Sequence, residues 1–280
     1  MEDIQDMSLK EKCYALQQKV NYFLDPDKYV IAHLDGRSFS KKIKNKFKKP
    51  FDDKFINAMN EAAIALCEGV QGALFAYVQS DEISLLIYKA SKDGQIFFNG
   101  RMCKLLSIIP SEASTKFTEE MTCNKLEDEI DISALSTPKE TLESCIKLVK
   151  NAPLYQFDCK VWNVDNANDA MAWFLFRNID CIRNSKQQTC QTYLPHKVLM
   201  SKNTDEQVEL LKTNKGIDWN KFDDGKKYGR LIKKVTIPHY DNEGNLAYER
   251  SKWEAFPFFD MTNVEKREDF INYFNLKDDN

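Results

Sequence analysis

The stretch His33-Leu34-Asp35-Gly36-Arg37-Ser38-Phe39 is the most informative part of this chain. It overlaps the apolar run 29–34, which by its length and composition is a buried strand that ends at Asp35-Gly36. A second stretch, Tyr77-Val78-Gln79-Ser80-Asp81-Glu82, repeats the arrangement. Here the strands 74–79 and 83–88 are joined by a tight turn and form a hairpin. Each stretch therefore places a carboxylate where a strand stops and a turn begins.

The elements that flank these strands predict an α+β fold. A helix that begins near Asp52-Asp53 and stops near Gly69 follows the first strand, and a second helix at about 95–119 follows the hairpin. A further strand covers 154–164. This order gives an antiparallel sheet with helices on one face. The end of the first strand then lies beside the hairpin turn, so we expect Asp35 and Asp81 to converge.

Other segments are expected to surround this sheet. An amphipathic helix opens the chain at about 8–22, and the polar segment 120–150 is an insertion or loop with a peripheral helix. After residue 166 the pattern predicts helical and small β additions: helices at 170–180, 187–200 and 204–213, then a hairpin of strands 231–238 and 247–256. We therefore expect an N-terminal domain over 1–165 and a C-terminal region over 166–280 packed on it as one unit.

Composition is ordinary for a globular protein, with 42% hydrophobic and 30% charged residues among 280. No apolar run is long enough for a membrane span, and the N-terminus has neither signal-peptide nor transit-peptide character, which favours a cytoplasmic protein. The eight cysteines include no Cys-x-x-Cys pair. Zinc-ligand spacing is therefore absent, and a disulfide scaffold is not expected.

The net charge is −3, yet the basic residues are clustered. Six lysines lie between Lys41 and Lys49, directly after the first carboxylate, and a second basic cluster lies between Lys226 and Lys234. A locally basic face on a mildly acidic protein is compatible with binding phosphate. A solvated lysine-rich surface fits the same pattern equally well.

Asp35 and Asp81 are candidate metal ligands. Two carboxylates can bridge two magnesium ions about 3.5–4 Å apart, one activating the attacking oxygen and the other holding a triphosphate. Gly36 lets the backbone come close to a metal or phosphate, and the amides from Gly36 to Ser40 would form a phosphate-facing turn, with Ser38 and Ser40 as further donors. Both aspartates would equally suit plain turns at strand ends, which periodicity alone does not exclude.

Further residues fit phosphate or RNA contacts without requiring them. Arg101 and Lys104 stand one helical turn apart and either clamp phosphates or form an ordinary solvent-facing pair. Arg183-Asn184-Ser185-Lys186 offers donors to an RNA end, although a plain helix terminus would look the same. His33, inside an apolar strand, is expected to be a satisfied buried residue, and Glu82 is expected to support the carboxylate site. P-loop, nucleophile-elbow and Gly-x-Gly-x-x-Gly patterns are absent.

Several ordered motifs resemble the tRNA-histidine guanylyltransferases and the related guanylyltransferase-like 3′–5′ RNA polymerases. They are HLDGRSF at 33–39, KKPFDDKF at 48–55, YVQSDEISLL at 77–86 and FFNGRMCKLLS at 97–107. FDCKVW at 157–162 looks like the family's Phe-Asp-x-Arg strand, with Lys160 in place of the arginine. The similarity is dense from about 10 to 190 and thinner at 215–219 and Gly229-Arg230.

The resemblance implies a polymerase-palm-like, ferredoxin-like catalytic domain in which Asp35, the Gly36 carbonyl and Asp81 hold two magnesium ions (Mg²⁺). It implies that nucleoside triphosphates, including ATP and GTP, contact Asp35, Gly36, Arg37, Ser38, Phe39, Ser40, Ser80 and Asp81, with Lys49, Arg101 and Lys104 at basic positions of the family pattern. RNA contacts are expected at Arg183, Asn184, Lys186 and Arg230. The implied reaction adenylylates a 5′-monophosphate with ATP and then adds a nucleotide to the 5′ end of tRNA. The family tendency is a homotetramer.

Two departures from the family pattern favour the guanylyltransferase-like branch. The guanylyltransferases carry a His-Ile-Asn-Asn-Leu-Tyr-Asn type motif after an Asp-Cys pair, whereas Asp180-Cys181 is followed here by Ile182-Arg183-Asn184-Ser185. Position 40, often histidine in the guanylyltransferases, is Ser40. The sequence thus favours template-dependent repair of 5′-truncated tRNA, with guanylation of tRNA-His as the alternative. A catalytically silent tRNA-binding protein and a nucleotidyl cyclase on a similar palm are the other hypotheses.

Overall fold

The computed structural model describes residues 8–42, 47–91, 93–129, 137–241, 243 and 245–276. Lys44 and Lys46 of the first lysine run, and Asn242 and Gly244 of the C-terminal turn, lie outside the described residues. The elements are α1 (Leu9–Gln18), β1 (Tyr29–Gly36), α2 (Phe39–Lys42), α3 (Asp53–Gly69), β2 (Ala73–Gln79), β3 (Glu82–Ile87), η2 (Phe97–Gly100), α4 (Met102–Glu129), α5 (Pro138–Lys150), β4 (Phe157–Val164), α6 (Ala167–Tyr193), α7 (His196–Leu199), α8 (Thr204–Lys215), η4 (Trp219–Lys221), α9 (Asp224–Lys227), β5 (Arg230–Tyr240), β6 (Leu246–Pro257) and α10 (Val264–Tyr273).

The strands form one antiparallel sheet in the order β4-β1-β3-β2-β5-β6. β1 lies between β3 and β4, and its register places Asp35 opposite Glu82 on one side and Asp158 on the other. The predicted α+β class with an antiparallel sheet is confirmed. Within the described residues, no helix is long and apolar enough to cross a membrane.

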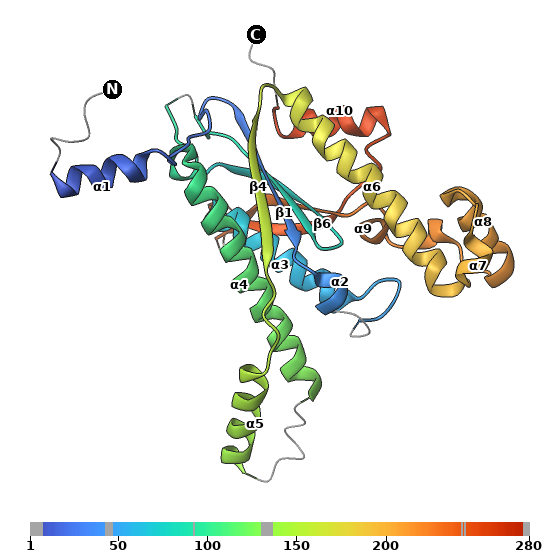
Figure 1. The fold of residues 1–280 in the computed structure, drawn as a ribbon. Helices are drawn as coiled ribbons and strands as arrows, with labels where there is room; N and C mark the ends of the chain where they lie inside the picture. The colour runs from blue at the N-terminus through green and yellow to red at the C-terminus, as the bar shows by residue number, and fades with distance from the viewer. Residues whose placement is uncertain are drawn as a thin grey trace.

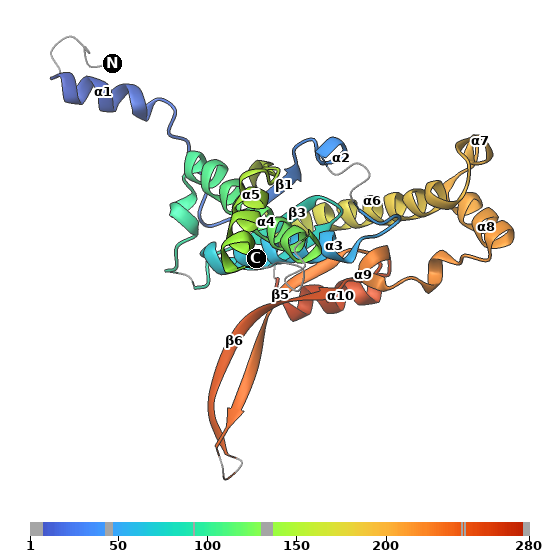
Figure 2. The ribbon, with the colours of Figure 1, turned by 90° about the horizontal axis from the view of Figure 1, so that it is seen from below.

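The C-terminal hairpin belongs to this same sheet. β5 pairs with β2 over residues 230–232 and with β6 along its whole length, and the hairpin tip projects away from the body (Figure 2). The sequence predicted the pairing of β5 with β6 but not the attachment to β2, because alternation shows the period of a strand and not its partner. The proposed domain boundary at residue 165 therefore falls within a unit whose sheet takes strands from both sides.

Helices cover both faces of the sheet (Figure 1). Successive side chains of a strand point to opposite faces, so Val30 and Leu34 of β1 pack with α3 and α4, whereas Tyr29 and Ile31 pack with α6 and α10. The helices of the N-terminal part lie on one face, as predicted, and the C-terminal helices cover the other.

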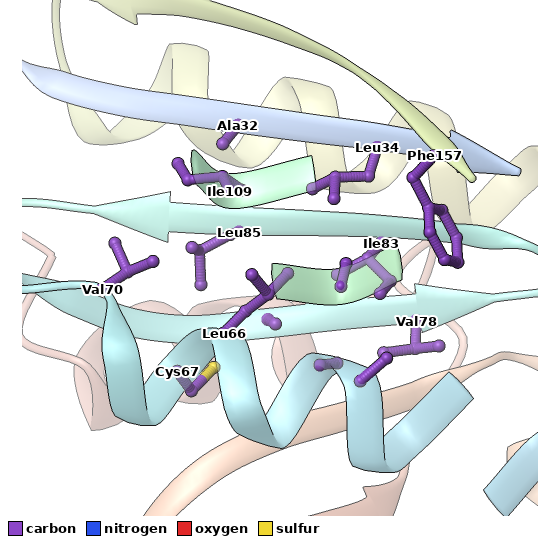
Figure 3. Packing of buried hydrophobic residues seen from close by; sticks show 14 of the residues in the cluster. Ala32, Leu34, Leu66, Cys67, Val70, Val78, Ile83, Leu85, Ile109 and Phe157 are labelled. Carbon is purple, nitrogen blue, oxygen red and sulfur yellow. The ribbon is translucent and has the colours of Figure 1, made fainter. Parts of the chain in front are cut away.

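The helix α3 fixes one side of the future site. It begins after Asp52, whose carboxylate accepts the Phe55 N–H at 3.0 Å and caps the helix. Figure 3 shows Leu66 of α3 reaching toward the strands of the sheet, with Cys67 beside it. Full burial of a side chain such as Leu66 stabilises the fold by roughly 1.5–3 kcal/mol. The buried face of α3 consists mostly of small residues, which let it approach the strands closely: Ala58, Met59, Ala62, Ala63, Leu66 and Cys67.

Two helices run further than the sequence predicted. α4 continues through Pro110 to Glu129, and α6 joins the predicted helices 170–180 and 187–200 as far as Tyr193. A proline inside a helix costs about 3 kcal/mol. Packing against the sheet offsets that cost in α4, whose buried side chains on both sides of the proline are Leu105, Ile109, Ala113 and Phe117. The peripheral helix predicted within 120–150 is α5, and the end of α4 takes the first part of that segment.

His33 is buried on β1 with its polar atoms satisfied. Its Nδ1 lies 3.0 Å from the Ser84 hydroxyl, which also accepts the indole N–H of Trp173 at 3.2 Å. The His33 ring packs edge-on against Trp173, with 5.1 Å between centroids. Burial lowers the pKa of His33 to about 4, and the positive Arg177 and Lys160 act in the same direction. His33 is therefore neutral at pH 7 and serves the core.

His33 makes the stability of the fold depend on pH. Between pH 6.5 and 4 the unfolded chain binds a proton at His33 that the folded chain does not bind. The free energy of unfolding should therefore decrease as pH falls through this window, by up to about 1.4 kcal/mol per pH unit. His33→Gln removes this titration while keeping a hydrogen-bonding group near Ser84. Urea unfolding of both proteins between pH 7.5 and 4.5 tests the prediction, and equal slopes would contradict it.

Candidate active site

Asp35 and Asp81 lie side by side where β1 ends and the β2–β3 turn begins. The Gly36 N–H donates to the Asp81 carbonyl at 3.0 Å, and Asp35 stands opposite Glu82 in the β1–β3 register. The convergence predicted from the order of the strands is confirmed. It results from antiparallel pairing, which brings the end of one strand to the turn that precedes its neighbour.

The two carboxylates are held together against electrostatic repulsion. Partial burial raises the pKa of Asp35 above its ordinary value, and the negative charge of Asp158 raises it further. Burial likewise raises the pKa of Asp81, and the Asp35 charge adds to that effect. A raised pKa means that the ionised form is unfavourable in the folded state. A divalent cation between the two groups would remove this penalty.

The Glu82 carboxylate accepts hydrogen bonds from side chains of the protein. The Arg177 guanidinium donates from Nε and Nη2 to the two Glu82 carboxylate oxygens at 3.0 and 3.1 Å, and the Gln79 amide donates to Oε2 at 2.8 Å. Arg177 also pairs with Asp180 at 2.6 Å, so it ties the β3 turn to α6. Such a bidentate pair fixes geometry as well as charge. Glu82 thus supports the position of Asp81, as the sequence suggested.

The donor set at this turn fits magnesium. Carboxylate oxygens and a backbone carbonyl are hard ligands, and Mg²⁺ usually takes one or two carboxylates and completes its shell with water and substrate phosphates. Across the described part of the chain, no group of three or more His, Cys, Asp or Glu side chains is arranged to hold a metal alone. Asp35, the Gly36 carbonyl and Asp81 are the groups that would hold the ions together with a substrate.

The chain turns sharply after Gly36. The Arg37 N–H donates to the Gln156 carbonyl at 2.8 Å, and the exposed Ser38 adopts a φ of +59°. Ser80 in the facing turn has a φ of +44°, and its hydroxyl donates to the Asp81 carboxylate at 3.1 Å. Positive φ at residues other than glycine is costly and is found preferentially at functional sites. Ser40 lies in the first turn of α2.

The ring of Phe39 does not face the site, so the predicted nucleotide contact at this residue would be made by its backbone. It is buried, and a Cβ added at Gly36 would lie 2.7 Å from the Phe39 Cγ. The ring therefore packs against the Gly36 backbone from behind, and only the backbone of Phe39 can meet a nucleotide. Its aromatic neighbours are Phe55, Phe117, Tyr155 and Phe157.

A cavity of about 350 Å³ opens beside Asp81. Pockets for small-molecule ligands are commonly about 300–1,000 Å³. Three rings and several cations line it, so it offers both stacking surfaces and positive charge. Its walls come from the loop 47–56, the turn 79–81, one face of α6 and the start of β5: Phe47, Lys48, Lys49, Pro50, Phe51, Asp52, Phe55, Ile56, Gln79, Ser80, Asp81, Cys181, Asn184, Ser185, Gln188, Lys226 and Arg230.

Some of the predicted site residues line this cavity, and the others lie elsewhere in the structure. Those that line it are Lys49, Ser80, Asp81, Asn184 and Arg230. Arg230 is buried at the cavity, and its predicted RNA contact stays a prediction. Arg183 is exposed and pairs with Asp180, whereas Lys186 pairs with Asp205 at 2.6 Å. RNA contacts at Arg183 and Lys186 stay predictions.

Arg101 and Lys104 lie near the other end of β1. Arg101 bridges to Phe23, which precedes that strand, and its Nε donates to the Asn21 side chain at 2.6 Å. The eight residues of β1 span roughly 20–25 Å. Arg101 and Lys104 therefore lie far from Asp35 within one copy of the chain, and their predicted nucleotide contact stays a prediction.

Sequence reasoning missed several residues of the cavity and its support. Arg177 was placed in a helix without a role, because its pairing with Glu82 depends on how α6 crosses the sheet. Gln79 and Gln188 gave no local signal either, whereas Lys226 belongs to the basic cluster that the sequence shows between Lys226 and Lys234. The aromatic wall could have been found, because Phe51 and Phe55 lie within the motif at 48–55.

Comparison with known proteins agrees with this geometry. The family model for tRNAHis guanylyltransferase matches residues 11–165. A protein of Acanthamoeba polyphaga mimivirus, described as uncharacterized, is 30% identical over 243 residues, which cover 81% of this chain and 77% of that protein. A tRNA(His) guanylyltransferase of Debaryomyces hansenii is 26% identical over 251 residues, 85% of each protein. A solved bacterial tRNA(His) guanylyltransferase-like protein in complex with ATP has a TM-score of 0.76 at 25% identity, covering 97% of this chain and 100% of that chain.

Removing one charge of the pair should separate metal binding from folding. Asp81→Asn takes away repulsion at neutral pH, so the metal-free variant should melt at or above the wild-type temperature. Mg²⁺ should raise the melting temperature of the wild type and not that of the variant, because a ligand stabilises only the state that binds it. Asp165→Asn, on an exposed residue that pairs with Lys28, is the control and should keep the Mg²⁺ effect. Equal Mg²⁺ stabilisation of the wild type and Asp81→Asn would contradict the assignment.

Because Gly36 lies against the Phe39 ring, its substitution by alanine should destabilise the fold strongly. Gly36→Ala places a methyl group 2.7 Å from a ring that cannot move, so we expect a loss of about 1–3 kcal/mol in the free energy of unfolding, together with weaker Mg²⁺ stabilisation. Adding Phe39→Leu to this variant should restore part of the free energy of unfolding and part of the Mg²⁺ stabilisation. Gly216→Ala, where an added Cβ meets nothing within 4 Å, should leave the Mg²⁺ effect unchanged. An Mg²⁺ effect of wild-type size in Gly36→Ala would argue against this turn as the site.

Proposed function

The chain belongs to the tRNA-histidine guanylyltransferase family of nucleotidyltransferases, and we propose that it adds nucleotides in the 3′–5′ direction to repair 5′-truncated tRNA in the cytoplasm. The observation that carries the proposal is the Asp35–Asp81 pair beside a cavity of nucleotide size. Nucleotidyl transfer depends mainly on positioning and charge neutralisation. Two carboxylates with an adjoining basic cavity therefore supply most of the protein chemistry that it needs.

Different residues would bind the metal ions, balance phosphate charge and contact the base. Asp35, the Gly36 carbonyl and Asp81 would hold two Mg²⁺, which when bound activate the attacking oxygen and neutralise the triphosphate. Lys49 faces the cavity and balances phosphate charge, while Phe47 and Phe51 offer apolar surface to a base. The ion pair of Arg177 with Glu82 keeps the Asp81 turn in position.

The proposed reaction has two transfer steps. In the first, an oxygen of the RNA 5′-monophosphate attacks the α-phosphorus of ATP, pyrophosphate leaves, and the 5′ end becomes an adenylate. In the second, the 3′-hydroxyl of an incoming nucleoside triphosphate attacks the activated 5′-phosphorus. AMP leaves, the hydroxyl proton passes to solvent, and the RNA is longer by one nucleotide at its 5′ end.

The wall formed by α6 supports templated repair rather than dedicated guanylation. Cys181, Asn184, Ser185 and Gln188 recur at helical spacing, so one face of α6 lines the cavity. The departure from the guanylyltransferase motif, at 182–185, falls on this same stretch. A changed motif beside the substrate supports a changed substrate preference.

Guanylation of tRNA-His is the second candidate. The printed name of the Debaryomyces hansenii relative, tRNA(His) guanylyltransferase, favours it. A dedicated guanylyltransferase would add G to full-length tRNA-His whatever base stands opposite. A repair enzyme would instead extend truncated tRNAs only with the nucleotide that pairs with the template.

A homotetramer, the tendency of the family, belongs to the same proposal. Two observations support assembly. The helix α1 buries none of its residues and leaves Leu9 and Leu16 largely exposed. Arg101 and Lys104 lie at the far end of β1 from Asp35, so assembly would let their basic side chains serve the site of a neighbouring copy.

Nucleotide addition to truncated tRNA tests the proposed function. With Mg²⁺ and ATP present, labelled nucleotide should join the 5′ end of a tRNA that lacks one or more 5′ nucleotides, and the base added should follow the templating base. Asp35→Asn and Asp81→Asn should reduce the rate by at least about 100-fold while remaining folded, because metal-ligand loss removes several kcal/mol of charge stabilisation. Asp165→Asn should retain activity. Untemplated G addition to full-length tRNA-His alone would favour the second candidate, and no product on any tRNA would reject both.

A further inference from the structure

Lys227 and Arg230 are buried cations close together in sequence, and they differ in whether a carboxylate of the protein pairs with them. Lys227 pairs with Asp224 at 2.8 Å and donates to the Asn220 carbonyl at 3.2 Å. Arg230 is equally buried, yet among the described residues its one side-chain hydrogen bond is to the neutral Asn60 amide, which accepts from Nε at 3.0 Å. Lys227 is therefore neutralised within the protein, and Arg230 is not.

The guanidinium of Arg230 lacks a counter-ion. Its Nη2 has no hydrogen-bond partner among the described residues, and no carboxylate in that part of the chain lies within 4.0 Å of it. Burial lowers the pKa of Arg230, although an arginine stays protonated at neutral pH. A buried charge without a partner is costly, so proteins seldom keep one unless a ligand completes it.

The neighbouring groups do not neutralise Arg230. Burial raises the pKa of Cys181 to about 11 and that of Tyr77 well above its ordinary value, so both are neutral at pH 7. The carboxylates of Asp52 and Asp81 line the same cavity, but neither forms an ion pair with the guanidinium. An anionic ligand in the cavity would therefore supply the partner that the described residues do not provide.

The backbone holds Arg230 firmly at the cavity. Gly229 has a φ of +86°, and a Cβ there would lie 2.7 Å from the Tyr77 ring. Tyr77 in turn donates to the Tyr228 carbonyl at 2.7 Å, and Arg230 pairs with Val78 in the β2–β5 ladder. A cation with so little backbone freedom is pre-organised for a ligand rather than free to swing into water.

We propose that Arg230 binds a phosphate group inside the cavity, carried by a nucleoside triphosphate or by the 5′ end of an RNA. The inference rests on the proposed function and sharpens it, because it gives the buried start of β5 a role in holding the substrate. Phosphate suits the position, since it brings the negative charge that the surroundings of Arg230 lack and can accept from two guanidinium nitrogens. The RNA contact that the sequence predicts for Arg230 is one of these two sources of the phosphate.

A pair of matched substitutions tests the role without turnover. Arg230→Met removes an uncompensated charge, so its ligand-free melting temperature should equal or exceed that of the wild type. Its affinity for inorganic tripolyphosphate, titrated with Mg²⁺ present, should fall roughly 10- to 100-fold, the range expected for a charge-assisted hydrogen bond. Lys227→Met, the control, should melt at a lower temperature because it leaves Asp224 unpaired, and it should bind tripolyphosphate as the wild type does.

A second variant covers the case in which Arg230→Met does not fold. Arg230→Gln is uncharged but can still donate to Asn60, and it should show the same loss of affinity. If neither variant folds, Arg230 is a structural residue and the inference is overturned. Unchanged tripolyphosphate affinity in a folded variant would overturn it equally.

Three further ligands identify the source of the phosphate. Weaker binding of GTP and ATP with unchanged RNA binding would assign the phosphate to the nucleotide, and weaker binding of a 5′-phosphorylated RNA than of its 5′-hydroxyl form, only in the wild type, would assign it to the RNA end. Weaker binding of GTP alone, with ATP and tripolyphosphate unaffected, would show base reading instead and overturn the inference. Because these titrations need no catalysis, an inactive wild type would contradict the proposed function while leaving this result standing.

Discussion

The pairing of β1 with β3 is the constraint on which the rest of the site depends. The hydrogen bond from Gly36 to Asp81 and the register that sets Asp35 opposite Glu82 hold acidic groups from two strands at one place. Helices pack on both faces of these strands, so the carboxylates cannot separate without disrupting the sheet. Packing of the core therefore offsets the unfavourable free energy of this repulsion, and binding of a divalent cation would remove it.

Asp81 and Arg230, on two walls of the cavity, form no ion pair within the described part of the chain, whereas Lys226 on the same cavity pairs with Asp53. Asp81 at one wall is destabilised by its neighbours, and Arg230 at another has no counter-ion. Glu82 and Lys227, which support the site from behind, are each matched within the protein. A magnesium nucleotide carries both missing charges, so one ligand would relieve both walls. Uncompensated charge at residues that would face a ligand lowers the stability of the ligand-free protein, a cost that functional sites commonly carry.

The sequence predicted what local patterns determine. The short strand segments at 29–34, 74–79 and 83–88 and the turn at Asp81 define a hairpin beside a strand, and that is enough to bring Asp35 and Asp81 together. The attachment of β5 to β2, which buries Arg230, joins segments far apart in the chain and leaves no local pattern. Motif resemblance also could not show that the Phe39 ring packs behind the turn instead of facing a ligand. The proposed split at residue 165 likewise rested on local helix and strand patterns, which do not record the shared sheet.

The central claim is that Asp35 and Asp81 hold paired metal ions against a nucleotide whose phosphates or base occupy the adjoining cavity. Anomalous diffraction from crystals grown with Mn²⁺ and a non-hydrolysable GTP analogue tests it most directly. The account predicts two manganese peaks about 3.5–4 Å apart between Asp35 and Asp81, with the nucleotide in the cavity beside them. Manganese bound elsewhere, or a nucleotide seated outside that cavity, would contradict it.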